Sequence, residues 1–310
     1  MIDQPNSTET GGFGHRRRRL FRQRKIPVRF LVPNFFTLLS LCAGVTAIRM
    51  AIESRYDFAV ALIVAAALLD GIDGRLARAL KAQSRFGAEL DSLADFINFG
   101  VAPAIIIFHW ALGDLKGFGW LAVLIFACGM GLRLARFNAM LEVDKPKWQS
   151  NYFTGIPAPA GAVTIFLPYY LTSLDIINAK SWPLAVSIYA LILAGLLVST
   201  IPTFSGKLLG ERISRELVLP VLVAAALVVG LLFTYPFATL AVVTILYLGL
   251  IPVSFRSYRR RTAEWDALHP DGPAPVAAPL QTAASAAAQA APMPPADAPV
   301  QGVPPGETKH

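Results

Sequence analysis

The sequence is short of charge and nearly free of cysteine. Only 15% of its 310 residues are charged, whereas 55% are hydrophobic; a soluble domain carries about 25% charged residues. The charges also leave long gaps. Residues 30–48 contain no charged side chain, and a helix needs about 20 apolar residues to cross a bilayer. Such runs lack the amphipathic period that would leave a polar face for water, which excludes a soluble globular protein.

The two cysteines, Cys42 and Cys128, both lie inside apolar runs, and no CxxC or Cys/His spacing is present. We therefore predict that they are small packing residues, not a disulfide or a metal pair.

The apolar runs predict an all-α fold, a polytopic helical membrane protein with about eight transmembrane helices. The runs are residues 30–48, 58–69, 97–113, 117–132, 157–174, 182–202, 217–234 and 236–255. Part of the net charge of +8 is concentrated at the two ends of this region, in HRRRRLFRQRK (15–25) and RSYRRR (256–261). Basic flanks mark the cytoplasmic side and contact anionic lipid, so we expect both termini inside and no nucleic-acid partner.

Three domains are expected from this pattern. Residues 1–29 form a basic cytoplasmic arm, and residues 30–255 form the transmembrane domain. Residues 256–310 form a cytoplasmic Pro/Ala-rich tail, which we expect to be disordered because its composition cannot build a core.

One acidic stretch, LLDGIDGRLARALKAQSRFGAELDSLADFINFG (68–100), interrupts the apolar pattern at an expected cytoplasmic boundary. A helix over 58–80 places one set of residues on a single face, at i, i+3, i+4 and i+7: Asp70, Asp73, Gly74 and Ala77. Arg78 lies at the edge of that face. A helix over 87–111 places a second set on one face, at i, i+4 and i+8: Gly87, Asp91 and Asp95.

Two antiparallel helices joined by KAQSRF can bring these faces together, so that four carboxylates converge. Converging carboxylates repel one another unless a proton or cation lies between them. Hard oxygen ligands suit Mg²⁺, Mn²⁺ or Ca²⁺, and paired metals recur in phosphoryl displacement. The small residues Gly74 and Ala77 leave a hollow for a ligand, where Arg78 can neutralise a phosphate. Taken singly, a glycine or alanine on a membrane helix is more often a packing residue.

The joint pattern D-x-x-D-G-x-x-A-R, eight residues, G-x-x-x-D-x-x-x-D resembles the signature of the CDP-alcohol phosphotransferase family. The resemblance implies a membrane enzyme, often a homodimer, that transfers a substituted phosphate from a CDP-linked donor to an alcohol and releases CMP. It implies that Asp70, Asp73, Asp91 and Asp95 bind a pair of divalent metals, Mg or Mn. It also implies that Gly74, Ala77, Arg78 and Gly87 shape the CDP-diacylglycerol pocket and that Asp95 is the catalytic base.

Four segments resemble the bacterial phosphatidylserine synthases of this family: VPNFFTLLSLCAG (32–44), FGAELDSLADFINFGVAPA (86–104), GLRLARFN (131–138) and YFTGIPAPAGA (152–162). INFG at 97–100 departs from the SFG expected there. We expect Phe153 and Gly155 to begin the fifth helix. Arg133, Arg136 and Asn138 are candidates for binding L-serine, because arginine can hold a carboxylate bidentately. The expected location is the bacterial inner membrane, with the active site facing the cytoplasm.

Other interpretations of the residues remain open. The acceptor alcohol could be glycerol 3-phosphate, inositol phosphate or choline, and a covalent aspartyl intermediate is an alternative to direct displacement. A divalent-cation transporter would also use acidic membrane helices, but it favours ionisable residues near mid-membrane and related halves. The sequence shows neither ionisable residues near mid-membrane nor two related halves.

Overall fold

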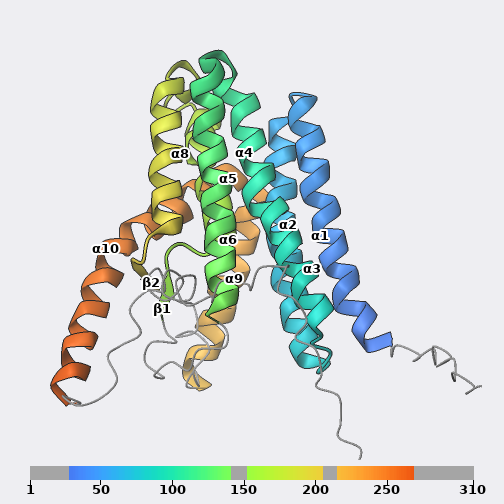
Figure 1. Ribbon diagram of the computed structural model, residues 1–310, viewed down its shortest axis with the longest axis vertical. Coiled ribbons are helices and arrows are strands. Elements are labelled where there is room, and N and C mark those ends of the chain that lie inside the picture. Colours follow the sequence, from blue (N-terminus) through green and yellow to red (C-terminus); the bar gives the residue numbers. More distant parts are fainter. Residues whose placement is uncertain (1–27, 141–151, 205–214, 269–310) are drawn as a thin grey trace, which may run out of the picture.

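The computed structural model describes residues 28–140, 152–204 and 215–268, which form an all-α bundle with one pair of short antiparallel strands (Figure 1). Almost all of the expected basic arm (1–29) lies outside the described residues, as does the tail beyond residue 268. Helix α10 continues to Leu268, so residues 256–268 are helical where we expected the tail to begin.

The first half of the bundle runs from α1 to α5. Its elements are α1 (Val28–Ile52), α2 (Tyr56–Ala79), α3 (Arg85–Asp95), the π-helix η1 (Phe96–Val101), α4 (Ala102–Ile107), the π-helix η2 (Phe108–Leu112), the 3₁₀ turn η3 (Gly113–Leu115) and α5 (Lys116–Ala139). The helix expected over 87–111 is thus one continuous pass, from α3 to η2, that contains two π-helical segments.

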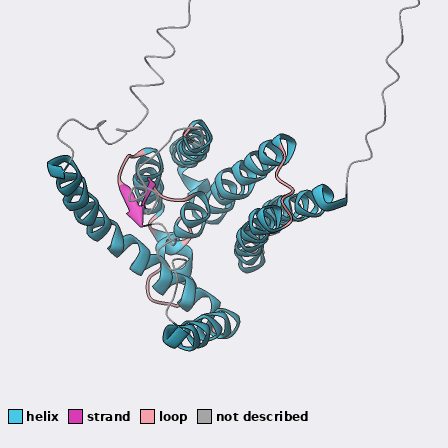
Figure 2. Ribbon diagram, turned by 90° about the horizontal axis from the view of Figure 1, so that it is seen from below, coloured by secondary structure: helices cyan, strands magenta, loops and turns pink. Residues whose placement is uncertain are grey.

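The second half contains shorter helices and the two strands. Its elements are β1 (Tyr152–Thr154), α6 (Ala158–Thr164), α7 (Leu167–Ser173), the 3₁₀ turn η5 (Ala179–Ser181), α8 (Pro183–Val198), β2 (Pro202–Phe204), α9 (Arg215–Thr234) and α10 (Pro236–Leu268). Strands β1 and β2 pair antiparallel, with Phe153 opposite Thr203. Figure 2 shows this pair as the only strands among the described helices.

Helix α1 packs along α2 through a row of small or polar residues. The buried members of this row are Pro33, Thr37, Ser40, Gly44, Ala47 and Ala51. Small residues let membrane helices approach closely, and Gly44 shows how closely. A Cβ added there would lie 2.0 Å from Oδ1 of Asn98, in η1. Asn98 in turn donates to Ser40 Oγ (2.8 Å), which donates to the Ala66 carbonyl (2.9 Å), so three passes are joined by one hydrogen-bonded chain.

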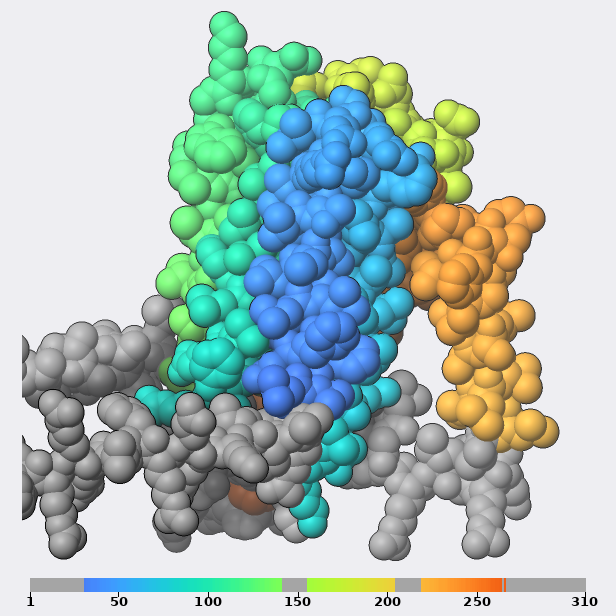
Figure 3. Space-filling view, turned by 90° about the vertical axis from the view of Figure 1, so that its right-hand side faces the viewer, coloured from blue at the N-terminus to red at the C-terminus, as the bar shows by residue number. Residues whose placement is uncertain are grey.

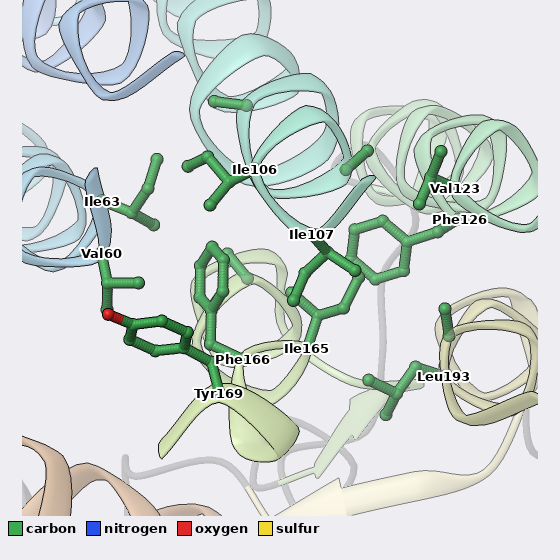
Figure 4. Close-up of a cluster of buried hydrophobic side chains, with 14 of the residues drawn as sticks. Val60, Ile63, Ile106, Ile107, Val123, Phe126, Ile165, Phe166, Tyr169 and Leu193 are labelled. Atoms are coloured by element: carbon green, nitrogen blue, oxygen red, sulfur yellow. The ribbon is translucent and has the colours of Figure 1, made fainter. Parts of the chain in front are cut away.

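The core lies where the middle passes meet α6 to α8. Figure 4 shows Ile63 of α2, Ile106 of α4, Phe126 of α5 and Phe166 directed toward one another. Each of these four side chains is essentially inaccessible. This rigid centre fixes how the ends of the passes lie relative to one another.

The prediction that the fifth helix begins at Phe153 and Gly155 is wrong. Residues 152–154 form β1, and the helix begins at Ala158. Gly155 explains the difference, because it has φ +75°, a conformation that favours glycine. Its amide donates to the Ile201 carbonyl (2.9 Å), and its carbonyl accepts from Thr203 Oγ1 (2.7 Å). The chain is therefore held against β2 before it can turn into α6.

The periphery is apolar. Within the described residues, three helical stretches are long and apolar enough to cross a membrane: Leu31–Ile52, Arg85–Ala139 and Pro236–Ala263. Helix α9 stands to one side of the body in Figure 3, and its apolar side chains from Leu219 to Phe233 are largely exposed. Cys42 and Cys128 are exposed too, so their prediction as packing residues is wrong.

Candidate functional site

A pocket of about 170 Å³ lies between α1, α2 and α3, and we call it the α1–α3 pocket. Its lining consists of Pro33, Asn34, Thr37, Asp73, Gly74, Ala77, Arg78, Ala82, Gln83, Ser84, Gly87, Ala88 and Asp91. Six of the eight signature positions therefore line one cavity. The two helices that carry them meet because α2 ends at Ala79 and Ser84 caps α3, with Ser84 Oγ accepting from the Gly87 amide (3.0 Å).

The glycines of this pocket have different roles. A Cβ added at Gly74 would meet only Arg78 Nη1, at 3.9 Å, so no neighbouring helix requires a glycine there. A Cβ added at Gly87 would lie 3.0 Å from Asn34 Oδ1 and 3.1 Å from Ser84 Oγ. Gly87 thus permits a close approach of α1 to the α3 cap. The absent side chain of Gly74 instead leaves room in the cavity, which argues against a packing role.

Three carboxylates converge beside the pocket. One oxygen from each of Asp70, Asp91 and Asp95 lies within 4.8 Å of the others. Asp73 is outside this trio: it is buried, and its Oδ2 accepts from the Thr37 hydroxyl (2.8 Å). Thr37 was not singled out by the sequence, although its place on the inner row of α1 is a signal that could have found it.

The carboxylate trio suits a divalent cation. Asp95 Oδ1 is buried and has no hydrogen-bond partner among the described residues. An unpaired buried acceptor is costly, and close carboxylates repel one another. A hard cation would satisfy both, since Mg²⁺ and Mn²⁺ prefer carboxylate oxygens.

A second polar group is formed by other elements, and we call it the Arg133 cluster: Arg133 of α5, Ile156, Thr203 of β2 and Tyr247 of α10. Arg133 is 9% exposed, and its Nε donates to the Ile156 carbonyl (2.8 Å). The segments GLRLARFN and YFTGIPAP, separate in the sequence, therefore touch through this bond. Arg133 interacts electrostatically with Asp95 and with Tyr247, and Tyr247 also interacts with Thr203.

The other two acceptor candidates make different contacts. Arg136 Nη1 donates to the Ser199 carbonyl (3.2 Å), at the end of α8. Asn138 Nδ2 donates to Ser92 Oγ (2.9 Å), one residue from Asp91, and so ties α5 to α3.

The departure at INFG has a structural counterpart. Asn98 is buried in η1, three residues after Asp95, and its amide bonds to Ser40 as described above. The side chain fits because position 44 is a glycine. Asn98 therefore belongs to the helix packing behind the carboxylates.

Comparison with known proteins gives a consistent result. A model of the CDP-alcohol phosphatidyltransferase family matches residues 30–201, and a model described as CDP-alcohol phosphatidyltransferase 2 matches residues 216–252. The chain is 39% identical over 245 residues to a CDP-diacylglycerol–serine O-phosphatidyltransferase of Mycobacterium bovis, covering 78% of this chain and 82% of that protein. It is 35% identical over 222 residues to the enzyme of that name from Helicobacter pylori, covering 71% and 88%. An archaetidylserine synthase of Methanothermobacter thermautotrophicus is 36% identical over 156 residues, covering 49% and 63%.

Proposed function

Since the chain belongs to the CDP-alcohol phosphatidyltransferase family, we propose that it transfers the phosphatidyl group of CDP-diacylglycerol to the hydroxyl of L-serine, giving phosphatidylserine and CMP. The observation that carries this proposal is the α1–α3 pocket, whose lining holds most of the signature and which adjoins the carboxylate trio. A nucleotide donor and a reacting centre can therefore lie side by side.

We assign two divalent ions, Mg or Mn, to Asp70, Asp73, Asp91 and Asp95. The convergence of three of these carboxylates and the unpartnered Oδ1 of Asp95 support the assignment. When bound, such ions neutralise the diphosphate of the donor and the charge on the departing CMP.

The protein's own residues orient the donor. Gly74, Ala77 and Gly87 keep the α1–α3 pocket open for the cytidine diphosphate. The exposed guanidinium of Arg78, on the pocket wall, holds a phosphate oxygen. The acyl chains remain among the apolar residues that cover the bundle surface.

Asp95 is the proposed catalytic base. It accepts the proton of the serine hydroxyl while the hydroxyl oxygen bonds to the phosphorus that carries diacylglycerol. The bond from that phosphorus to the CMP oxygen breaks, and CMP leaves with the electron pair. Arg133, Arg136 and Asn138 are the proposed acceptor residues. Positioning and charge neutralisation supply most of the rate in such displacements.

The proposed topology has eight spans with both termini in the cytoplasm of a bacterial inner membrane. The spans would be α1, α2, α3 to η2, α5, α6 with α7, α8, α9 and α10, all within the transmembrane domain 30–255. In Figure 1 the first residues of α1, the α2–α3 connection and the last residues of α10 lie at the same end of the bundle, which supports one side for both termini and the active site. We retain the cytoplasmic arm 1–29 and the tail as part of this proposal, with the tail's disordered part beyond the helix. The homodimer rests on the family resemblance.

The test is a CMP-release assay. Purified protein in detergent is incubated with CDP-diacylglycerol and Mn²⁺ or Mg²⁺, and CMP is measured with L-serine, glycerol 3-phosphate, inositol phosphate or choline as acceptor. We expect release with L-serine and formation of phosphatidylserine. Release with glycerol 3-phosphate and none with L-serine would overturn the proposal.

A further inference from the structure

We propose that Tyr247 and Arg133 together bind the carboxylate of the amino-acid acceptor, so that the last helix of the bundle helps determine acceptor specificity. This inference rests on the proposed function, because it names the group that recognises the acceptor in that reaction. It assigns a role to Tyr247, which lies far from the signature in the sequence.

The first observation is a buried cation without an ion pair. Arg133 is 9% exposed, yet no described carboxylate lies within 4.0 Å of its guanidinium; the one such pair in the described residues joins Arg49 and Glu53. Asp95 acts on Arg133 only from a longer distance. A buried charge requires a partner, and Nε of Arg133 is already used by the Ile156 carbonyl. The terminal nitrogens are left to donate to an anion, which a carboxylate accepts bidentately.

The second observation is a buried hydroxyl without a hydrogen bond. The oxygen of Tyr247 is buried and makes no hydrogen bond within the described residues, although it lies close enough to interact with Arg133 and Thr203. The Thr203 hydroxyl donates its one proton to the Gly155 carbonyl, so towards Tyr247 it can act only as an acceptor. Because the Tyr247 hydroxyl has no partner in hydrogen-bonding geometry among the described residues, it can donate to the same anion as Arg133, and two converging donors form a carboxylate site.

The location suits a short acceptor. Arg133 interacts with both Tyr247 and Asp95, so an anion bound by Arg133 lies near the proposed base. In serine only one carbon separates the hydroxyl-bearing carbon from the carboxylate, so a serine anchored here brings its hydroxyl toward Asp95. Choline has a positive charge that Arg133 would repel. A phosphate dianion would favour a second buried cation beside Arg133, whereas Arg136 is only half-buried and bonds to the Ser199 carbonyl through Nη1.

The backbone around Arg133 is built to hold it. Gly155 has a positive φ, and a Cβ there would lie 2.9 Å from the Leu197 carbonyl oxygen and 3.0 Å from that of Ser199. This close approach fixes the turn after β1 and with it the Ile156 carbonyl that holds Arg133 Nε. Strand β2, which carries Thr203, packs against α10 and so places Tyr247 at the same point.

The test compares two variants with two matched controls in the full-length protein. Tyr247→Phe removes only the hydroxyl. Arg133→Lys keeps the positive charge but removes the planar guanidinium that can bind a carboxylate bidentately. Tyr189→Phe removes a hydroxyl that already bonds to the Thr164 carbonyl (2.7 Å), and Arg49→Lys changes an arginine in an exposed pair. We expect KM for L-serine to rise about tenfold or more in Tyr247→Phe and Arg133→Lys, because a hydrogen bond to a charged group is lost. KM for CDP-diacylglycerol should stay within about twofold, and both controls should match the wild type in both constants.

A second readout does not depend on turnover. L-serine, but not serinol, which lacks the carboxylate, should raise the melting temperature of the wild-type protein, and this shift should be lost in both variants. An unchanged KM for L-serine in Tyr247→Phe, or equal stabilisation of the wild type by serinol, would overturn the inference. If the wild type itself releases no CMP with L-serine, the proposed function fails instead, so the two failures are distinguishable.

Discussion

The α1–α3 pocket and the Arg133 cluster are built in opposite ways. The α1–α3 pocket takes most of its lining from two helices that follow one another in the chain, joined by a short connection that Ser84 caps. The Arg133 cluster takes one residue each from α5, the turn after β1, β2 and α10. A site made by neighbouring helices leaves a compact pattern in the sequence, while a site made by distant segments leaves isolated residues.

This difference suggests a division of labour. The α1–α3 pocket and the carboxylates serve the donor and the bond-breaking step, which are common to every acceptor. The Arg133 cluster serves the acceptor. If this division holds, changes in the α1–α3 pocket should alter KM for CDP-diacylglycerol and leave KM for L-serine unchanged. Changes in the Arg133 cluster should do the reverse.

The largest effect is expected from changes in the carboxylate trio, which serves the reaction with every acceptor. Asp91→Asn and Asp95→Asn each remove a negative charge from the carboxylate trio. We expect turnover to fall by about a thousandfold with any acceptor, since metal binding or proton transfer is lost. The measurement is CMP release under saturating substrates, with Asp114→Asn, at an exposed turn, as the control. Full activity in Asp95→Asn would remove the basis of the metal assignment.

The next largest effect is expected from a change that narrows the α1–α3 pocket, where the donor is proposed to bind. Gly74→Leu places a side chain into the α1–α3 pocket, whereas Gly71→Leu, three residues earlier on α2, places one where nothing lies within 4 Å. We expect kcat/KM for CDP-diacylglycerol to fall by about 10- to 100-fold in Gly74→Leu, because the leucine side chain would occupy space proposed for the cytidine diphosphate. Gly71→Leu should match the wild type. Both variants should keep the wild-type melting temperature, and a large loss of stability in Gly74→Leu would mean that Gly74 is a packing residue after all.

A smaller effect is expected on the acceptor side from Gly155→Ala. The added Cβ would approach two carbonyl oxygens, and alanine disfavours the positive φ. The Ile156 carbonyl should shift, which would raise KM for L-serine by about tenfold, leave KM for CDP-diacylglycerol unchanged and lower the melting temperature by several degrees. Gly195→Ala in α8, where a Cβ meets nothing, is the control. A rise in KM for both L-serine and CDP-diacylglycerol would contradict the division between a donor site and an acceptor site.

The smallest kinetic effect is expected from Gly44, which takes part in helix packing and lies in neither site. In Gly44→Ala the Cβ would collide with Asn98. We expect a loss of thermal stability, as in overpacked cores, with turnover reduced a few-fold at most. The second change Asn98→Ser should restore part of the lost melting temperature by making room. If it restores none, the two residues are not coupled.

Much of the donor side could be predicted from the sequence. The spacing of Asp70, Asp73 and Gly74, and of Gly87, Asp91 and Asp95, follows helical periodicity, and α2 and α3 present these residues to a common region. Thr37 was missed because a threonine in an apolar run attracts no notice by itself, although its helical spacing with Pro33, Ser40 and Gly44 places it on the inner row of α1. The separation of Asp73 from the trio depends on its bond to Thr37, which a pattern within α2 and α3 cannot predict.

The acceptor side was less predictable. Arg133 was among three polar residues on α5 with equal claims, and its burial and its bond to the Ile156 carbonyl distinguish it from Arg136 and Asn138. Tyr247 lies in an apolar run where a tyrosine attracts no notice. Its significance comes from the packing of α10 against β2, a long-range contact. Strand β1 was mistaken for the start of a helix because the effect of Gly155 depends on β2, a partner strand far along the chain.

The π-helical turn η1 has a consequence for how the chain can change in length. A π turn accommodates one more residue than an α turn, so deletion of one residue from 96–101 would allow the pass to close as an ordinary α-helix. Six residues in π geometry turn the chain through nearly the same total angle as five residues in α geometry, because the wider turn rotates the chain less per residue. Asp91 and Asp95 could therefore still face Asp70 while Ile106 and Ile107 kept their places in the core. A deletion within the regular helix α3 would instead rotate the preceding residues by about 100°, so this pass can change its length by one residue at η1 more readily than within α3.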